Sequence, residues 1–156
     1  MNKQQIIRAL KAANSVAASA LEDGRHPFGA VLIGPDGSEV LMQQGNEGTV
    51  RHAETELARR AAEQYDADFL AGCTLATNFE PCAMCAGTIY WANIGRVIYG
   101  VSESSLLELT GAHQENPTLD LPCRTVFGAG QKLVEVIGPV PEMQAAILQL
   151  HKDFWS

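Results

Sequence analysis

The order of the expected elements predicts an α/β protein with a central sheet. Two observations support this prediction. Strand-like apolar runs alternate with helical periodicity along the chain, and the turn signal Gly-Pro-Asp-Gly at residues 34–37 joins the first two strands. Because a tight turn makes its two strands antiparallel, we expect a mixed sheet. The prediction is a three-layer α/β/α sandwich around a central mixed sheet, in a single domain spanning residues 1–156.

The first half of the chain begins with an amphipathic helix and a hairpin. Apolar side chains separated by three or four residues predict a helix over residues 3–22, and its many alanines suggest close approach to a sheet. The apolar run 27–33 and the segment 38–44 form the expected hairpin, and a loop follows at 45–51. Residues 52–64 favour a helix because they are rich in good helix formers.

The second half continues the alternation of strands and helices. Pro81 marks the start of a helix, since proline has no N–H to leave unsatisfied at the first helical position. In order, the expected elements are a buried strand at 73–77, a helix at 82–92, a strand at 96–101, a short helix at 104–110, an irregular polar segment at 111–122, a strand at 133–137 and a helix at 143–154.

Composition and charge narrow the class of protein. A hydrophobic fraction of 46% and a charged fraction of 19% are those of an ordinary globular chain. The formal net charge of −7 disfavours broad contact with a nucleic-acid backbone. No apolar run reaches the ~20 residues that span a bilayer, and the N-terminus lacks the apolar core of a signal peptide. We therefore expect a cytoplasmic protein with reduced cysteines and no membrane partner.

Two short stretches carry candidate chemistry: His-Ala-Glu at residues 52–54 and Pro-Cys-Ala-Met-Cys at residues 81–85. Cys82 and Cys85 are three residues apart at the start of a helix, so both can reach one ion. With His52 they make a nitrogen and sulfur ligand set typical of Zn²⁺, and three protein ligands leave the fourth position for water. We predict that His52, Cys82 and Cys85 hold catalytic zinc and that Glu54 moves protons beside it.

Three other roles for these residues are a structural zinc site, a redox cysteine pair and a binding module without catalysis. A structural zinc with four ligands would need Cys73 or Cys123, and neither belongs to a second C-x-x-C pair. A redox cysteine pair would leave His52 and Glu54 unexplained. A zinc-stabilised binding module without catalysis would have no use for a carboxylate that is not a ligand.

The complete pattern, H-x-E followed by P-C-x-x-C, is the signature of zinc-dependent nucleobase deaminases. Zinc lowers the pKa of water from about 15.7 towards 7. By this signature, Glu54 takes a proton from that water and delivers it to the ring nitrogen and the leaving ammonia. The expected reaction is hydrolytic deamination, with a small-molecule nucleobase and water as substrates.

Beyond the signature, the whole chain resembles the cytidine-deaminase-like superfamily. The segment Glu-Pro-Cys-Ala-Met-Cys-Ala-Gly at 80–87 is similar to both the tRNA adenosine deaminases and the bacterial guanine deaminases. Residues 27–31 and 89–92 resemble the guanine-deaminase branch, in which an aromatic residue at the place of Phe28 lines the base pocket. The tRNA branch usually has a smaller aliphatic residue there. The resemblance implies five strands, the last two parallel, and a homodimer.

The resemblance also implies a set of substrate-binding residues. Asn46 matches a loop asparagine that contacts the base, and His113 or Glu115 lies nearest to an acidic residue that assists proton transfer. The C-terminal aromatic segment is similar in position to one that closes the pocket in the guanine-deaminase branch, where it is exchanged across a dimer. In this chain it could close its own pocket or a partner's, or Phe154 and Trp155 could simply cap the last helix onto the core. The residues expected at the substrate are Phe28, Asn46, Ala53 through its backbone amide, Trp91, His113 and Trp155.

The expected substrate is a free nucleobase or a similar small aminated heterocycle, such as the purine guanine. Deamination of tRNA adenosine is a rival, which the acidic charge and Phe28 oppose. Deamination of cytosine or of a nucleoside is a second rival within the same chemistry.

Overall fold

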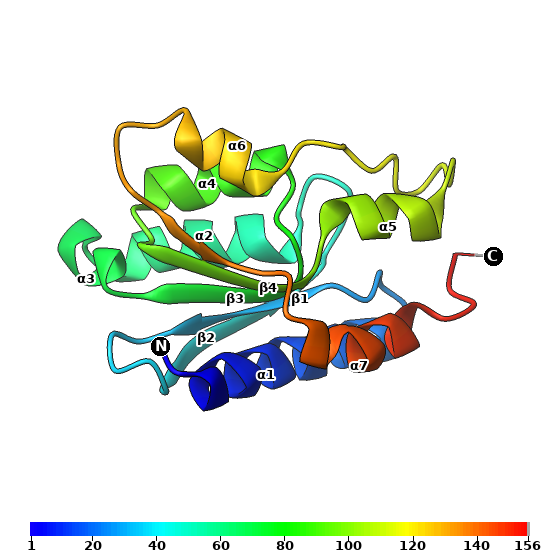
Figure 1. Ribbon diagram of the computed structural model, residues 1–156, viewed down its shortest axis with the longest axis horizontal. Coiled ribbons are helices and arrows are strands. Elements are labelled where there is room, and N and C mark those ends of the chain that lie inside the picture. Colours follow the sequence, from blue (N-terminus) through cyan, green and yellow to red (C-terminus); the bar gives the residue numbers. More distant parts are fainter. Residues whose placement is uncertain (156) are drawn as a thin grey trace.

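The computed structural model describes residues 1–155, and Ser156 lies outside the described residues. Its elements follow the expected alternation of helices and strands (Figure 1). In order they are α1 (Lys3–Glu22), β1 (Gly29–Ile33), β2 (Val40–Gly45), α2 (Ala53–Gln64), α3 (Ala67–Ala71), β3 (Thr74–Phe79), α4 (Ala83–Ala92), β4 (Arg96–Val101), α5 (Glu103–Thr110), α6 (Cys123–Gly128), β5 (Glu135–Ile137) and α7 (Pro141–His151).

The five strands form one mixed sheet in the order β2-β1-β3-β4-β5. Strand β1 is antiparallel to both β2 and β3, whereas β3, β4 and β5 run parallel. Every residue of β1 and β3 is buried, as expected for strands covered on both faces. The predicted hairpin and the predicted parallel pair at the end of the chain are therefore confirmed.

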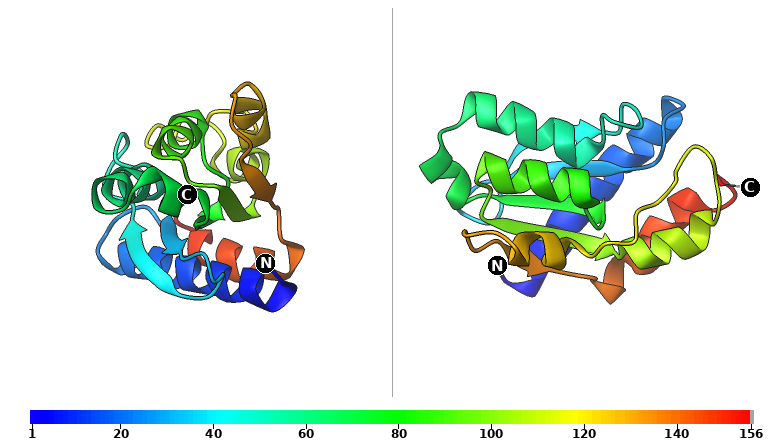
Figure 2. Two further views of the ribbon diagram at one scale, coloured as in Figure 1. Left: turned by 90° about the vertical axis from the view of Figure 1, so that its left-hand side faces the viewer. Right: turned by 90° about the horizontal axis from the view of Figure 1, so that it is seen from above.

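Helices cover both faces of the sheet and complete the three layers. Helices α1 and α7 pack on one face, and α2, α3, α4 and α6 lie on the other (Figures 1 and 2). The close approach expected for α1 is confirmed at Gly29, where a Cβ atom would collide with the backbone of Ala13 and Ala17. The predicted α/β/α sandwich is the observed fold.

Two short helices and the end of the chain differ from the prediction. Helices α3 and α6 have five and six residues, too short to show a periodic apolar pattern. Helix α7 ends at His151 rather than at 154, because Lys152 is extended and Asp153 has a positive φ of 65°. This turn directs Phe154 and Trp155 back toward the body of the protein.

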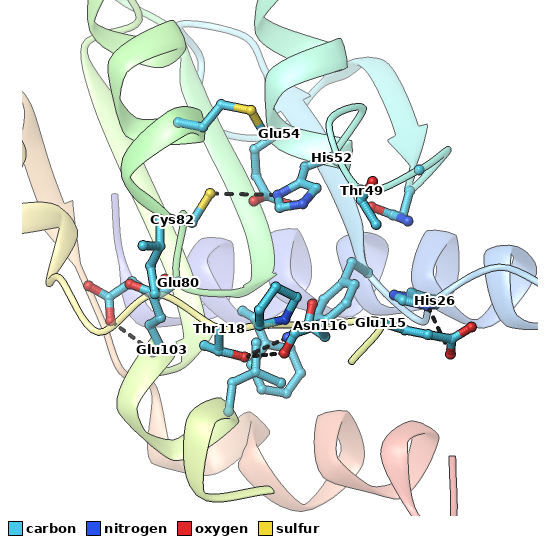
Figure 3. Close-up of a pocket in the computed structure, with 18 of the residues that line it drawn as sticks. His26, Thr49, His52, Glu54, Glu80, Cys82, Glu103, Glu115, Asn116 and Thr118 are labelled. Carbon is cyan, nitrogen blue, oxygen red and sulfur yellow. Dashed lines mark hydrogen bonds and ion pairs between the residues drawn. The ribbon is translucent and has the colours of Figure 1, made fainter. Parts of the chain in front are cut away.

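The topology brings several element ends together at one edge of the sheet. The parallel strands β3 and β4 end at Phe79 and Val101, and α4 and α5 begin a few residues later. The N-terminus of α2 lies at the same edge, as the close-up in Figure 3 shows. The carboxyl ends of parallel strands are a common place for ligand sites in α/β proteins. Within residues 1–155, no helix is long and apolar enough to cross a membrane.

Candidate metal centre and active site

Two helix starts bring His52, Cys82 and Cys85 together. His52 is the N-cap of α2 and Cys82 is the N-cap of α4, yet neither side chain caps its own helix. His52 Nδ1 lies 3.6 Å from Cys82 Sγ and 3.5 Å from Cys85 Sγ, and the two sulfurs are 3.6 Å apart. These two side chains are thus directed toward each other rather than toward their helix termini (Figure 3).

The spacing of these three atoms fits a zinc ion. Tetrahedral zinc with Zn–S of about 2.3 Å and Zn–N of about 2.0 Å places its ligand atoms roughly 3.5–3.8 Å apart. The three observed separations lie within this interval. His52 also hydrogen-bonds to the backbone of Thr49, a contact that would fix the orientation of a metal-binding imidazole. The three residues could therefore hold the metal with little rearrangement.

Glu54 lies beside this group and is 6% exposed. Its Oε1 accepts a hydrogen bond from the Thr77 hydroxyl at 3.2 Å. Burial raises the pKa of Glu54 to about 7. Glu56, two residues along the same helix, is instead bound by Arg51 and Arg59, and hydrogen bonds from Arg51 and then Arg59 lower its pKa. A carboxyl group that titrates near neutral pH can both accept and donate a proton, as Glu54 would need to do.

A cavity of about 470 Å³ opens beside the metal-binding group. This volume lies within the usual range for small-molecule sites. Its lining includes His52, Glu54 and Cys82 together with apolar and polar side chains, as Figure 3 shows. The lining includes His26, Phe28, Asn46, His52, Glu54, Phe79, Glu80, Cys82, Glu103, Leu106 and the segment 114–119.

The aromatic residues Phe28 and Phe79 line one side of this cavity, and Trp155 packs against Phe28 from outside the lining. Phe28 packs edge-on against Phe79 with ring centroids 5.6 Å apart. Trp155 lies behind them, 6.2 Å from Phe28 and 4.9 Å from His26. The C-terminal segment therefore packs beside the pocket of its own chain.

His151 holds this C-terminal segment in place. Its Nδ1 accepts a hydrogen bond from Trp155 Nε1 at 3.0 Å, and its Nε2 contacts the Pro27 carbonyl oxygen at 2.8 Å. This pair of contacts requires the neutral imidazole with its proton on Nε2. Burial lowers the pKa of His151 to about 4, so the neutral form is the stable one at pH 7.

The structure brings some of the predicted substrate residues to the cavity and leaves others behind it. Phe28 and the buried Asn46 line the cavity. Ala53 is packed in the hydrophobic core behind His52. His113 lies against Trp155, with ring centroids 5.1 Å apart. Glu115 lines the cavity and has a carboxylate oxygen 3.8 Å from His26 Nε2.

The expectation for Trp91 requires correction. Its side chain is 82% exposed, and its ring packs edge-on against Tyr90 with Lys132 Nζ 6.0 Å away. Trp91 follows Cys82 by nine residues, which is two and a half turns of an α-helix. It therefore projects from the side of α4 opposite to the metal-binding group, and the structure does not place it at the cavity.

Two cavity-lining carboxyl groups had no assigned role in the sequence. Glu80 accepts hydrogen bonds from the backbone N–H groups of Glu103 at 3.0 Å and Cys123 at 2.7 Å, so it joins the starts of α5 and α6. Its position directly before the Pro-Cys pair was a usable signal. Glu103 is only 3% exposed, and burial raises its pKa to about 8. Nothing in the sequence distinguishes Glu103 from an ordinary acidic residue at a helix start.

Comparison with known proteins identifies the family. The family described as the cytidine and deoxycytidylate deaminase zinc-binding region matches residues 3–101. The chain belongs to this family. It is therefore a deaminase-family protein, a hydrolase type that acts on C–N bonds, with zinc as the family's metal. The predicted superfamily and cofactor are both confirmed, and the His/Cys/Cys group could hold that metal.

Relatives in this deaminase family differ in the substrates that their names give. A protein from Schizosaccharomyces pombe described as a probable cytosine deaminase is 38% identical over 157 residues, covering 94% of this chain and 90% of the relative. The guanine deaminase of Bacillus subtilis is 36% identical over 104 residues, covering 64% of this chain and 66% of the relative. A solved structure of guanine deaminase from Nitrosomonas europaea has a TM-score of 0.73 at 18% identity, over 94% of this chain and 82% of that one. This last likeness supports the fold alone.

Proposed function

We propose that this protein hydrolytically deaminates a free nucleobase, with His52, Cys82 and Cys85 holding zinc and Glu54 transferring protons. The observation that carries the proposal is the buried Glu54 carboxyl group, which lies beside the three potential ligands and lines a cavity of small-molecule size. A purely structural zinc would have no use for such a carboxyl group, since burying it without a cationic partner costs free energy. This argues against a non-catalytic binding module.

The residues of the chain account for the proton movements of the reaction. Bound zinc supplies a Lewis acid that lets water lose a proton near neutral pH. Glu54 accepts this proton while the water oxygen bonds to the aminated ring carbon, and it protonates the ring nitrogen. Glu54 next takes the remaining proton from the hydroxyl group on that carbon and passes it to the amine as the C–N bond breaks, so that ammonia leaves and a carbonyl remains. The Thr77 hydroxyl, 3.2 Å from Glu54 Oε1, holds the carboxyl group in position.

For the substrate, we propose a purine such as guanine. The edge-on pair of Phe28 and Phe79 provides an apolar wall for a flat ring, and Asn46 adds a polar contact. The cavity has room for a two-ring base. Support also comes from the similarity to the guanine deaminase of Bacillus subtilis.

Cytosine is the second candidate substrate. The Schizosaccharomyces pombe relative is named a probable cytosine deaminase, and its similarity extends over nearly the whole chain. A pyrimidine would occupy the same metal-proximal part of the cavity and leave space near the 114–119 segment. The net charge of −7 favours either small base over tRNA, whose backbone would be repelled.

Three further properties belong to this proposal. The chain acts as a single deaminase domain over residues 1–156, functions in the cytoplasm and forms a homodimer, as the resemblance to bacterial guanine deaminases implies. Size-exclusion chromatography with light scattering tests the last property, because a mass near twice 16.8 kDa is expected.

Ammonia release from a panel of substrates tests the proposal. The panel contains guanine, cytosine, adenine, the matching nucleosides and tRNA, offered to protein that holds about one zinc per chain. We expect turnover of guanine or cytosine with kcat/KM at least ~10²-fold above that of the nucleosides, since a free base fits without a ribose. Absence of turnover with every compound would refute the enzymatic proposal, and activity confined to tRNA would refute the free-base assignment.

A further inference from the structure

The segment 112–119 forms a single layer of chain between the cavity and solvent. Residues 114–119 line the cavity on the side away from the metal-binding group (Figure 3). The same segment is open to solvent, since Leu119 is 51% exposed and the Glu115 side chain is 68% exposed. This segment, the 112–119 loop, can therefore change position without disturbing the hydrophobic core.

Hydrogen bonds within the 112–119 loop hold its residues together. The backbone N–H of Glu115 donates to His113 Nδ1 at 3.1 Å, and the N–H of Thr118 donates to the carbonyl oxygen of Asn116 at 2.8 Å. The hydroxyl groups of Thr110 and Thr118 are 3.1 Å apart and join the end of α5 to the far part of the loop. Compact loops with close ends and internal packing are structural units of their own. The 112–119 loop is therefore expected to move as one body.

The two ends of the loop are held differently. Gly111 ends α5 with φ 58° and ψ −129°, a conformation that residues with a Cβ atom rarely adopt. Beyond the loop, the N–H of Leu121 hydrogen-bonds to Glu103, and the N–H of Cys123 donates to Glu80 at 2.7 Å. Both carboxyl groups belong to buried residues. The chain is thus fixed at 121–123, and Gly111 is the position at which it can turn.

Two weak contacts join the loop to segments from the two ends of the chain. Glu115 Oε2 lies 3.8 Å from His26 Nε2, and the His113 ring packs edge-on against Trp155 with centroids 5.1 Å apart. The first pair is too long for a hydrogen bond and its carboxylate is exposed, so it contributes little free energy. His26 and Trp155 also contact each other, with ring centroids 4.9 Å apart. The loop is therefore closed onto one aromatic cluster, and opening it costs little.

The depth of the site makes such a loop useful. Glu54 is 6% exposed and Cys85 is fully buried, so a base that reaches them lies between the metal-binding group and the 112–119 loop. Small-molecule sites bury about 70–90% of their ligand. Closed loops exclude water during a reaction, whereas substrate entry and product release need an opening.

We propose that the 112–119 loop is a lid that turns at Gly111, admits the substrate when open and closes over it against His26 and Trp155. This role rests on the proposed function only in that the enclosed ligand is a free base. The lid controls entry and release, while the reaction stays with the residues of the metal-binding side. A nucleotide within a polymer cannot be enclosed in this way, because its backbone continues on both sides.

Hydrogen–deuterium exchange of zinc-loaded protein tests the lid. The ligands are uracil and xanthine, the products of cytosine and guanine deamination. Without ligand, amides 112–119 should exchange at least ~10-fold faster than those of α2, because the loop opens without unfolding the core. Saturation with the base that binds should slow their exchange at least ~3-fold, because the open position is less populated. Loop amides that exchange as slowly as α2, or that ignore a bound base, would show a fixed wall and overturn the lid.

Two glycine variants test the hinge in ligand-free protein. A Cβ atom would meet open space at both Gly111 and Gly128, but Gly111 has a positive φ and Gly128 does not. Gly111→Ala should disfavour the closed position and raise exchange at 112–119 at least ~3-fold, with α2 unchanged. Gly128→Ala, at the end of α6, is the matched control and should leave the loop unchanged. Equal effects of the two variants, or a rise that extends to α2, would overturn the hinge.

These measurements separate the lid from the catalytic proposal. Zinc-loaded wild-type protein without turnover of any compound would refute the proposed function. Exchange at 112–119 in ligand-free Gly111→Ala reports on the lid whether or not the protein turns over a substrate.

Discussion

The two sides of the cavity are built in different ways. The metal-binding side consists of two helix starts, and His52, Glu54, Cys82 and Cys85 all lie within four residues of a helix N-terminus. The opposite side is assembled from Phe28 and the 114–119 segment, with Trp155 packed behind Phe28, and these parts lie far apart in the chain.

The residues proposed to carry out the reaction are therefore held by local structure, whereas the residues proposed to select the substrate are held by tertiary packing. Helix starts are local structures that direct a few side chains with little dependence on the rest of the chain. They therefore suit a metal-binding group whose atoms must be held within a few tenths of an ångström. Segments joined only through tertiary packing can change without disturbing the metal. Relatives whose names give cytosine or guanine are consistent with a common metal-binding side and a variable opposite side.

Cys82→Ala is expected to have the largest effect, because it removes one of the three proposed zinc ligands. This variant is expected to lose zinc and at least ~10³-fold of activity, because the remaining two ligands are too few for a stable site. Zinc per chain is measured by atomic emission alongside ammonia release. Cys73→Ala is the control, since Cys73 lies in the core away from this group and should keep its metal. Unchanged zinc content in Cys82→Ala would show that the ligand set is wrong.

Glu54→Gln tests the proton carrier with the metal left in place. Activity should fall by roughly 10²–10⁴-fold, the usual scale for loss of a general acid/base, while zinc content persists. Glu56→Gln is the matched control in the same helix turn, because Glu56 binds Arg51 and Arg59 instead of lining the cavity. Glu56→Gln should stay within ~3-fold of the wild-type rate. Near-normal turnover in Glu54→Gln would contradict the assigned role.

Protonation of His151, which holds the C-terminal aromatic segment, should make the free energy of unfolding depend on pH. Its pKa is about 4 in the folded protein and 6.5 as its ordinary value, so the unfolded chain takes up the proton first. The free energy of unfolding should therefore fall as the pH drops from 6.5 to 4, by up to about 3 kcal/mol. His151→Gln keeps a donor and an acceptor but does not titrate.

Urea denaturation of the wild type and of His151→Gln between pH 4 and pH 7 measures this effect. The difference between the two proteins should change with pH. Burial also lowers the pKa of His26, which therefore contributes to the curves of both proteins. Parallel curves for the two proteins would show that His151 does not titrate with folding.

The smallest effect is expected for Trp91→Ala. Trp91 is exposed on α4 and directed away from the cavity, so kcat/KM and zinc content should stay within ~2-fold of the wild type. Steady-state kinetics with the accepted base measures this. A fall in kcat/KM of more than ~10-fold would show that Trp91 contributes to substrate binding although it is exposed.

Much of the fold could be predicted because its signals are local. Helix α1 matches its predicted bounds of 3–22, and β4 matches 96–101, since periodicity and turn residues define both. The helices α3 and α6 were not predicted because one or two turns show no period. The end of α7 was misplaced because the apolar pattern continues beyond His151, while the backbone turns at Asp153.

By itself, the sequence determined the three-layer fold, the family and the reaction type, because these depend on periodicity and on residues a few positions apart. Only the tertiary structure decided which residues share the cavity. It brought Glu80 and Glu103 into the lining of the cavity, left Trp91 exposed on the side of α4 away from the metal-binding group, and set Trp155 behind Phe28. The physical reason is that hydrogen-bond partners and burial are set by packing between distant segments.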